Sequence, residues 1–282
     1  MKKTALILEG GGFRGLFTSG VLDYFLEKNI RFPYVIGVSM GACNGASYVS
    51  NQHGRNKIVN TAFVKDARYM SYRRLLLKGE LFGMNFIFDE VPQGIVPFDY
   101  ETYYASSQTF KVVVTDIESG QAVYLNNKED MDLMSALQAS ASLPFISKPV
   151  QIMGKPCLDG GISDSIPIDK ALEDGFEKFV VILTQPRSFV KEESSVNKFA
   201  KLKYRKYPMM EKLLNTRHDN YNKARQKIFD LEKEGRAFII EPQTKIPAGR
   251  IERDQEILYK SFDMGYDEVR KNKDALKTFL NL

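Results

Sequence analysis

The sequence is poor in cysteine and histidine, with two of each among its 282 residues. Cys43 and Cys157 lie far apart and form no repeated spacing, which excludes a disulfide framework and gives no sign of a zinc site. This cysteine usage is typical of a reducing compartment, so we expect a cytoplasmic protein. His53 and His218 are the only histidines available to any catalytic mechanism.

Long apolar runs are also missing. The N-terminal sequence MKKTALILE has a basic start, but its apolar stretch ends after about five residues, shorter than the roughly 7–15 of a signal peptide. No apolar run reaches the roughly 18–20 residues that cross a bilayer. We therefore expect any membrane contact to be peripheral, at the inner membrane face.

Positive charge is concentrated in one part of the chain. The formal net charge is +5, whereas residues 187–236 alone contain 14 Lys and Arg against 7 Asp and Glu. Such a segment can attract anionic lipid or nucleic acid, or it can form a solvated helical face with no partner. We recognise no nucleic-acid-binding module and expect no nucleic acid. Two alternatives stay open for 187–236: a solvated helical face, which is the commoner case for such a segment, and peripheral contact with an anionic membrane.

Apolar periodicity predicts alternating strands and helices. Residues 4–9 and 33–39 are short apolar runs that flank a helical pattern at 16–29, which is typical of a βαβ unit in a buried parallel sheet. The remaining predictions are helices at 40–50, 57–77 and 131–141, hairpins at 111–125 and 150–158, a helix after Pro167, strands at 178–183 and 237–240, and helix from 254 to the end. Composition becomes more charged after residue 186, which predicts an α/β domain at 1–186 and a basic, mainly helical region at 187–282.

The first predicted strand leads into the sequence GGGFRG. Glycines at 10, 12 and 15 match the spacing of a dinucleotide-binding loop. That site also needs an acidic residue at the end of the second strand, to bind the ribose. The second strand ends in Gly37-Val38-Ser39 instead, and the nearest earlier acids lie inside the helix. A dinucleotide site is therefore disfavoured.

The sequence Gly37-Val38-Ser39-Met40-Gly41 is a G-x-S-x-G motif at a predicted strand-to-helix junction. In that context the glycines allow a sharp turn that exposes the serine hydroxyl at the edge of the sheet. A serine nucleophile also needs an oxyanion hole. The glycine loop ends at the same edge, so its amides can face Ser39, while Arg14 can hold the loop, orient a phosphorylated head group or form a surface ion pair.

Two candidates remain for the base. Ser39, Asp159 and His218 occur in the chain order of an α/β-hydrolase triad. His218, however, lies in a polar stretch typical of a solvated histidine, and His53 follows the predicted elbow by more than two helical turns. Asp159 precedes two glycines in LDGG, which is either a plain turn or an uncrowded catalytic carboxylate.

Four blocks together resemble the patatin-like phospholipases. They are GGGFRG, GVSMG, the sequence ASLPF at 141–145 and DGG at 159–161, and they occur in the family's order within residues 4–186. The resemblance implies a three-layer α/β/α sandwich with a mainly parallel central sheet. It also implies hydrolysis of fatty-acyl esters by a Ser-Asp dyad, with no histidine, cofactor or metal.

Carried over by position, the resemblance makes Ser39 the nucleophile and Asp159 the general base. It assigns the oxyanion hole to Gly11 and Gly12, supported by Arg14. The glycines of the elbow and loops are then Gly10, Gly15, Gly37, Gly41, Gly160 and Gly161. The family often has Asn six residues after the aspartate, where this chain has Ser165, a difference that bears on loop rigidity and substrate fit.

Two further questions stay open at this level. The apolar segment 81–88 can line an acyl-chain groove, act as a lid or simply pack in the core. The chain can also be a catalytically silent protein of the same fold that binds lipid or serves as a scaffold.

Overall fold

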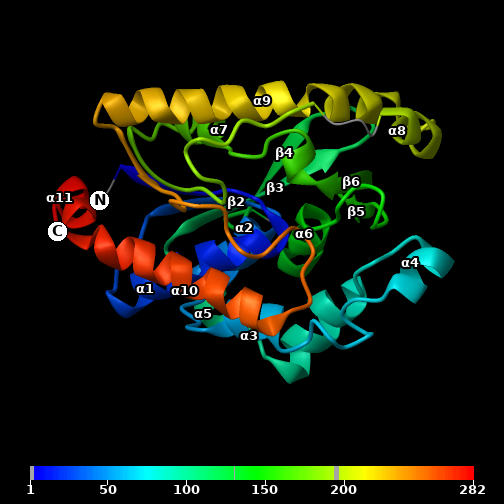
Figure 1. Ribbon diagram of the computed structural model, residues 1–282, viewed down its shortest axis with the longest axis horizontal. Coiled ribbons are helices and arrows are strands. Elements are labelled where there is room, and N and C mark those ends of the chain that lie inside the picture. Colours follow the sequence, from blue (N-terminus) through cyan, green and yellow to red (C-terminus); the bar gives the residue numbers. More distant parts are fainter. Residues whose placement is uncertain (1–2, 130, 194–196) are drawn as a thin grey trace.

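A computed structural model describes residues 3–129, 131–193 and 197–282 of the chain (Figure 1). Residues 1–2 of the basic N-terminal start and residues 194–196 of the basic segment therefore lie outside the described residues. Within the described ranges, eight strands form one sheet. They are β1 Thr4–Leu8, β2 Tyr34–Val38, β3 Thr109–Asp116, β4 Ala122–Asn126, β5 Val150–Ile152, β6 Lys155–Asp159, β7 Lys178–Ile182 and β8 Ala237–Ile240.

Helices connect these strands and cover both faces of the sheet. The α-helices are α1 Leu16–Glu27, α2 Met40–Val49, α3 Arg55–Thr61, α4 Tyr72–Lys78, α5 Tyr100–Ala105, α6 Leu133–Ser140, α7 Ile168–Glu173, α8 Asn197–Lys203, α9 Pro208–Lys233, α10 Gln255–Lys271 and α11 Lys273–Leu280. Three other helical segments are η1 Gly12–Gly15, η2 Phe86–Ile95 and η3 Gly160–Ile162.

The sheet is parallel through its centre and antiparallel at one edge. Its order is β5-β6-β3-β2-β1-β7-β8, with β4 also paired to β3. Strands β3, β2, β1, β7 and β8 run parallel, whereas β4, β5 and β6 form antiparallel pairs. This confirms the predicted mainly parallel sheet and both predicted hairpins. Because the carboxyl ends of β1 and β2 meet at one edge, the glycine loop and Ser39 lie beside each other there.

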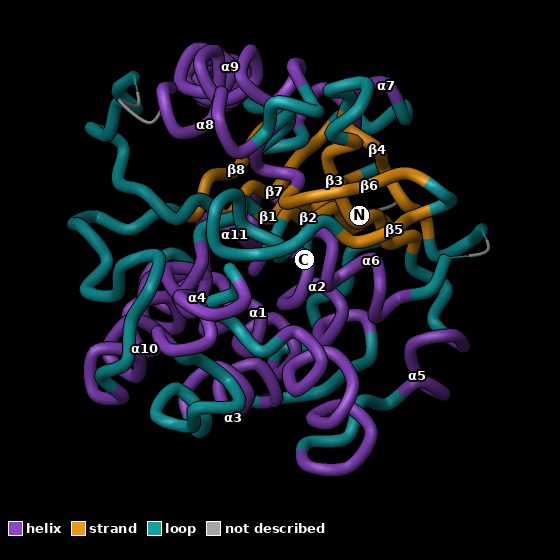
Figure 2. Tube along the Cα trace, turned by 90° about the vertical axis from the view of Figure 1, so that its right-hand side faces the viewer, coloured by secondary structure: helices purple, strands orange, loops and turns teal. Residues whose placement is uncertain are grey.

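Alternate residues of the buried strands supply two separate cores. On β1, Leu6 and Leu8 pack with α1, α2 and α10, while Ala5 and Ile7 pack with α7 and α9. Figure 2 shows the strands as one band between α9 on one side and α1, α3 and α10 on the other. The three-layer α/β/α fold is therefore confirmed.

The single helix predicted over 57–77 is wrong. The chain forms α3, then turns, and starts α4 where the Ser71 side chain accepts a hydrogen bond from the Arg74 amide. Between the two helices, Met70 forms an antiparallel bridge with Phe82. That bridge draws the ends of the segment together, so α4 projects from the body with no buried residue (Figure 1).

The region after residue 186 completes the same sheet rather than standing apart from it. Strand β8 pairs in parallel with β7, and α10 packs along α1. At Gly20 of α1 and Gly265 of α10 the backbones approach so closely that a Cβ would lie 2.1 Å from the Phe262 carbonyl oxygen and 1.9 Å from that of Phe17, respectively. The composition change near 186 thus falls within one continuous sheet. Among the described residues no helix is long and apolar enough to cross a membrane.

Candidate active site

Ser39 occupies a sharp turn between β2 and α2. Its φ and ψ angles of 55° and −127° lie outside the regions that a serine ordinarily adopts, as expected for a nucleophile elbow. The side chain is 5% exposed. The flanking glycines permit this turn, because a Cβ on Gly37 would lie 2.7 Å from the Gly41 carbonyl oxygen and one on Gly41 would lie 2.6 Å from that of Leu8.

A second serine holds the elbow in place. The Ser39 amide donates to the Ser140 hydroxyl at 2.8 Å, and that hydroxyl donates to the Val113 carbonyl at 2.6 Å. Ser140 is fully buried at the end of α6. Since a buried amide without a partner is costly, this chain of two hydrogen bonds stabilises the strained backbone. No motif in the sequence marks Ser140, although this residue directly precedes the ASLPF block.

Asp159 ends β6 and faces the elbow. Its backbone is fixed at two points: its amide donates to the Ser142 carbonyl at 2.9 Å, and its carbonyl accepts from the Thr115 hydroxyl at 2.8 Å. Its carboxylate accepts from the Gly161 amide at 2.7 Å. Only 3% of the residue is exposed. The structure therefore brings Ser39 and Asp159 to the same cavity, as the sequence predicts.

The surroundings of Asp159 have opposing effects on its proton affinity. Burial raises the pKa of the carboxyl group above its usual range, because a buried charge loses its hydration. The Arg217 guanidinium, the Ser39 hydroxyl and the Gly161 amide each lower the pKa in part. Burial dominates, so Asp159 is a stronger base than a solvated aspartate.

The glycine loop is packed against a distant part of the chain. Gly12 has a φ of +58°, and the Phe13 amide donates to the Arg250 carbonyl at 3.3 Å. Gly11 and Gly12 line the cavity with Ser39. In the part of the chain that the structure describes, no acceptor pairs with the Gly11 amide. Gly10, which also lines this cavity, and Gly15 lie against the elbow, where added Cβ atoms would lie 3.2 Å from the Ser39 Cβ and 2.4 Å from the Met40 Cγ, respectively.

The loop after Asp159 is braced despite the absence of the family's asparagine. The Ser165 hydroxyl donates to the Gly161 carbonyl at 2.8 Å, and the Arg217 Nε donates to the same carbonyl. At Gly160 a Cβ would lie 2.2 Å from the Val113 carbonyl oxygen. Ser165 and Arg217 together therefore hold this loop.

Two cavities of opposite character meet at Ser39. One is lined mainly by apolar side chains, and four residues of the 81–88 segment contribute to it: Phe82, Met84, Ile87 and Phe88. The other is polar and includes Asp159 and four basic residues: Arg14, Lys191, Arg217 and Arg250. Gly12, Ser39, Leu143 and Arg250 line both. The 81–88 segment also supplies core residues, since Leu81 and Phe86 are buried.

The histidines lie elsewhere. His218 is on α9, with its Nε2 3.3 Å from the Asp219 carboxylate, and it lines neither cavity at Ser39. His53 is exposed beyond the end of α2 and lines neither cavity. The structure therefore does not bring either histidine together with Ser39. Within the described ranges, no group of three or more His, Cys, Asp or Glu residues could hold a metal ion.

Three of the four cavity cations could not be found from the sequence. Lys191, Arg217 and Arg250 come from the region after residue 186, far along the chain from GGGFRG and GVSMG. No spacing or motif relates them to Ser39. They reach the site only because the C-terminal region folds back over the edge of the sheet.

Comparison with protein families gives two matches. The family model for patatin-like phospholipase matches residues 6–172, and a domain of unknown function, DUF6363, matches residues 207–281. The first match covers more than half of the chain and includes the glycine loop, Ser39 and Asp159.

Similar proteins were found among both curated sequences and solved structures. An uncharacterized Escherichia coli (strain K12) protein, YjjU, is 30% identical over 190 residues, which cover 65% of this chain and 52% of YjjU. An uncharacterized NTE family protein of Mycobacterium tuberculosis (strain H37Rv), Rv1063c, is 25% identical over 171 residues, covering 59% and 44%. The chain thus spans about half the length of the curated relatives that it matches.

VipD from Legionella pneumophila has a similar fold. Its crystal structure aligns with 98% of this chain and 67% of its own, with a TM-score of 0.52 and 13% identity.

Proposed function

Because the chain belongs to the patatin-like phospholipase family, we propose that it is a lipid acyl hydrolase that cleaves fatty-acyl esters with Ser39 as nucleophile and Asp159 as general base. The observation that carries the proposal is the placement of both side chains in one cavity, next to the glycine loop. The Ser-Asp assignment needs no histidine, and neither His53 nor His218 lines that cavity.

The first half-reaction is acylation. The Ser39 hydroxyl attacks the ester carbonyl while Asp159 accepts its proton, and the raised pKa of Asp159 makes that transfer easier than it is to a solvated aspartate. The glycine-loop amides at Gly11 and Gly12 stabilise the negative oxygen of the tetrahedral intermediate. Collapse of the intermediate breaks the ester bond, and Asp159 returns the proton to the departing alcohol.

The second half-reaction is deacylation. Water attacks the acyl-Ser39 ester and gives a proton to Asp159, while the same amides stabilise the second oxyanion. The products are a free fatty acid and Ser39, whose oxygen recovers the proton. Each turnover therefore consumes one ester and one water and releases one alcohol and one acid.

The apolar cavity suits the acyl chain. Its lining comes mainly from α2, α3, α6 and the 81–88 segment, and Ser39 is among the residues that line it. Burial of each methylene in such a cavity contributes about 0.8 kcal/mol. Longer acyl chains should therefore bind better than short ones until the cavity is filled.

Helix α4 suits contact with a lipid surface. Leu76 and Leu77 are 87% and 72% exposed, and they stand between the basic residues Arg73 and Lys78. The bridge between Met70 and Phe82 joins the two ends of the segment that carries α4, and Phe82 lines the apolar cavity. We therefore place membrane contact at α4 as well as at 187–236, and contact with the inner membrane face from the cytoplasm stays a prediction.

A series of p-nitrophenyl esters from butyrate to laurate tests the function. For a lipid acyl hydrolase, kcat/KM rises with chain length, whereas flat or falling values contradict the assignment of the apolar cavity. A fluorophosphonate probe distinguishes a hydrolase from a catalytically silent lipid-binding protein. Mass spectrometry should find Ser39 labelled in a hydrolase and unlabelled in a protein without turnover.

A further inference from the structure

The polar cavity beside Ser39 is lined by more cationic than anionic side chains. It is lined by the cations Arg14, Lys191, Arg217 and Arg250 and by two acids, Glu9 and Asp159. None of these four cations lies within ion-pair distance of a carboxylate in the part of the chain that the structure describes; the ion pairs found there join other residues, such as Lys111 with Asp174. Four cations against two carboxylates leave a formal excess of two positive charges when all six groups are ionised.

The two acids are already engaged by other donors. Glu9 is 1% exposed and accepts from the Tyr221 hydroxyl at 2.8 Å and the Thr184 amide at 2.5 Å. Asp159 accepts from the Gly161 amide. Arg14, in contrast, has a buried Nε with no hydrogen-bond partner among the described residues. The Arg14 Nε is therefore a hydrogen-bond donor without an acceptor, whereas both carboxylates of the cavity already accept hydrogen bonds.

The cations also raise one another's free energy. The pKa of Lys191 is lowered to about 7, first by burial and then by the charges of Arg217 and Arg250. Burial lowers the pKa of Arg217 to about 10, and Arg250 adds to that effect. Arg14, Lys191 and Arg217 are partly buried, whereas Arg250 is exposed. Holding partly buried like charges side by side is unfavourable unless an anion joins them.

Two of the four cations are held in position before any ligand arrives. The Lys191 backbone exchanges two hydrogen bonds with the Asn222 side chain, at 2.9 and 3.0 Å, and its ammonium group lies 4.5 Å from the Tyr221 ring centre. The Arg217 side chain donates to the Gly161 carbonyl. The cluster therefore combines cations from several elements, with Lys191 and Arg217 anchored by these contacts.

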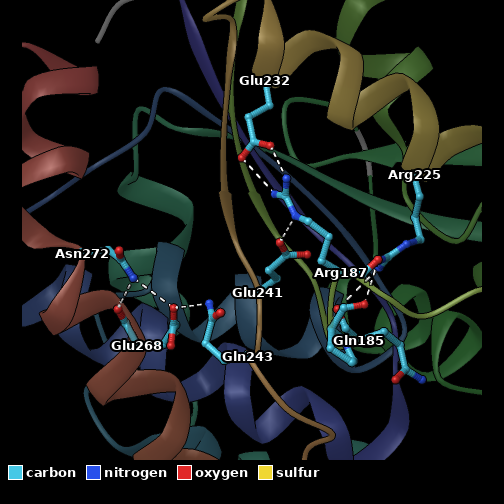
Figure 3. A network of polar contacts seen from close by, with 9 residues as sticks. Gln185, Arg187, Arg225, Glu232, Glu241, Gln243, Glu268 and Asn272 are labelled. Carbon is cyan, nitrogen blue, oxygen red and sulfur yellow. Dashed lines mark hydrogen bonds and ion pairs between the residues drawn. The ribbon is translucent and has the colours of Figure 1, made fainter.

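A separate network anchors the loop that leads to Lys191. Arg225 of α9 donates to the backbone carbonyls of Gln185, Pro186 and Arg187, and Arg187 pairs with Glu232 and Glu241 (Figure 3). Arg187 and Arg225 thus form contacts within the protein, whereas Lys191 and Arg217 line the cavity.

We propose that this cavity is a phosphate subsite, and that the preferred substrates are fatty-acyl esters whose alcohol carries a phosphate monoester. The inference rests on the proposed function, since it places the acyl chain in the apolar cavity and the alcohol in the polar one. Guanidinium groups bind phosphate oxygens through paired, charge-assisted hydrogen bonds. A choline or ethanolamine head group would bring a further cation into a cavity whose carboxylates are already engaged, so zwitterionic lipids fit less well.

Three esters with the same acyl chain test the proposal: 1-lauroylglycerol 3-phosphate, 1-lauroylglycerol and 1-lauroylglycero-3-phosphocholine. The wild type should cleave the phosphate monoester with a kcat/KM about tenfold or more above that of either other ester, the factor that one charge-assisted hydrogen bond supplies. Lys191→Gln and Arg250→Gln should each reduce this ratio several-fold. Lys223→Gln, an exposed lysine on α9 that does not line the cavity, is the matched control and should leave the ratio unchanged.

A binding experiment separates this proposal from the proposed function. Glycerol 3-phosphate should raise the Tm of Ser39→Ala, a variant without the nucleophile, and the rise should be lost when Arg250→Gln is added. If Ser39→Ala responds as expected but the wild type cleaves none of the esters, the hydrolase assignment fails and the phosphate site stands.

Equal kcat/KM for the phosphate and neutral esters in an active wild type would overturn the proposal. In an active wild type, a Tm rise with inorganic phosphate but no preference among the esters would also overturn it, because the cavity would then bind a free anion and not a lipid head group.

Discussion

The carbonyl oxygen of Arg250 lies directly over Gly12, so that a Cβ on this glycine would be only 2.4 Å from it. The Phe13 amide donates to the same carbonyl. The loop of the proposed oxyanion hole is thus shaped by a residue almost 240 positions further along the chain. This contact links the C-terminal region to the reaction centre.

Gly12→Ala should therefore damage the loop. The added methyl group meets the Arg250 carbonyl, and alanine at a φ of +58° costs about 1–2 kcal/mol. We expect a lower Tm and a fall in kcat towards the roughly hundredfold loss that follows removal of one oxyanion donor. Gly94→Ala is the matched control, because nothing lies within 4 Å of its added Cβ. Unchanged kcat in Gly12→Ala would argue against a role for this loop.

Ser140→Ala tests the support of the elbow. It leaves the Ser39 amide and the Val113 carbonyl without their shared partner, which costs about 1–3 kcal/mol for a buried donor. We expect a lower Tm together with a lower kcat at nearly constant KM. Ser142→Ala is the control, since within the described ranges that buried hydroxyl bonds to the Gln138 carbonyl alone. Equal effects of the two substitutions on kcat would contradict a specific support of Ser39.

The sequence predicts those parts of the site that short motifs mark, and it does not predict the parts that tertiary packing brings in. Residues GGGFRG, GVSMG and Asp159 lie at strand ends, where apolar runs and glycines mark the turns, and the structure brings them together. Helix 57–77 was mispredicted because its apolar pattern does not reveal the bridge between Met70 and Phe82. The positions of Arg217 and Arg250 depend on how α9 and the β8–α10 connection pack, which no local pattern encodes.

The pH dependence should separate the two ionisable groups. Asp159 acts as a base only when ionised, and its pKa is raised, so hydrolysis of a neutral ester should rise with pH until that carboxyl group is fully charged. Lys191, which faces Glu9, Arg14, Arg217 and Arg250, loses its charge as the pH rises through about 7. The preference for a phosphate ester over a neutral one should therefore fall above neutral pH.

Lys191→Gln gives the check on that profile. Ratios of kcat/KM for the two esters, measured upward from pH 7, should decline in the wild type and stay flat in the variant. A decline of the same size in Lys191→Gln would show that another group titrates.

Leu76→Ser combined with Leu77→Ser should weaken binding to lipid vesicles. Each leucine contributes about 1.5–3 kcal/mol when it leaves water, so the double variant should sediment far less with anionic vesicles and hydrolyse vesicle lipid more slowly. Hydrolysis of a soluble ester reports whether the fold is intact. Leu282→Ser is the control, because Leu282 is 60% exposed at the C-terminus, at the opposite end of the molecule from α4 (Figure 1). Equal vesicle binding by both variants would contradict a role for α4.

Hydrolysis of p-nitrophenyl laurate by four purified proteins tests the Ser-Asp assignment most directly: the wild type, Ser39→Ala, Asp159→Asn and His218→Ala, each confirmed to be folded by its Tm. We expect Ser39→Ala and Asp159→Asn to lose at least about a thousandfold in kcat/KM, since each removes one member of a unit that acts together, while His218→Ala keeps nearly full activity. A His218→Ala variant as inactive as Ser39→Ala, or an active Asp159→Asn variant, would contradict the dyad.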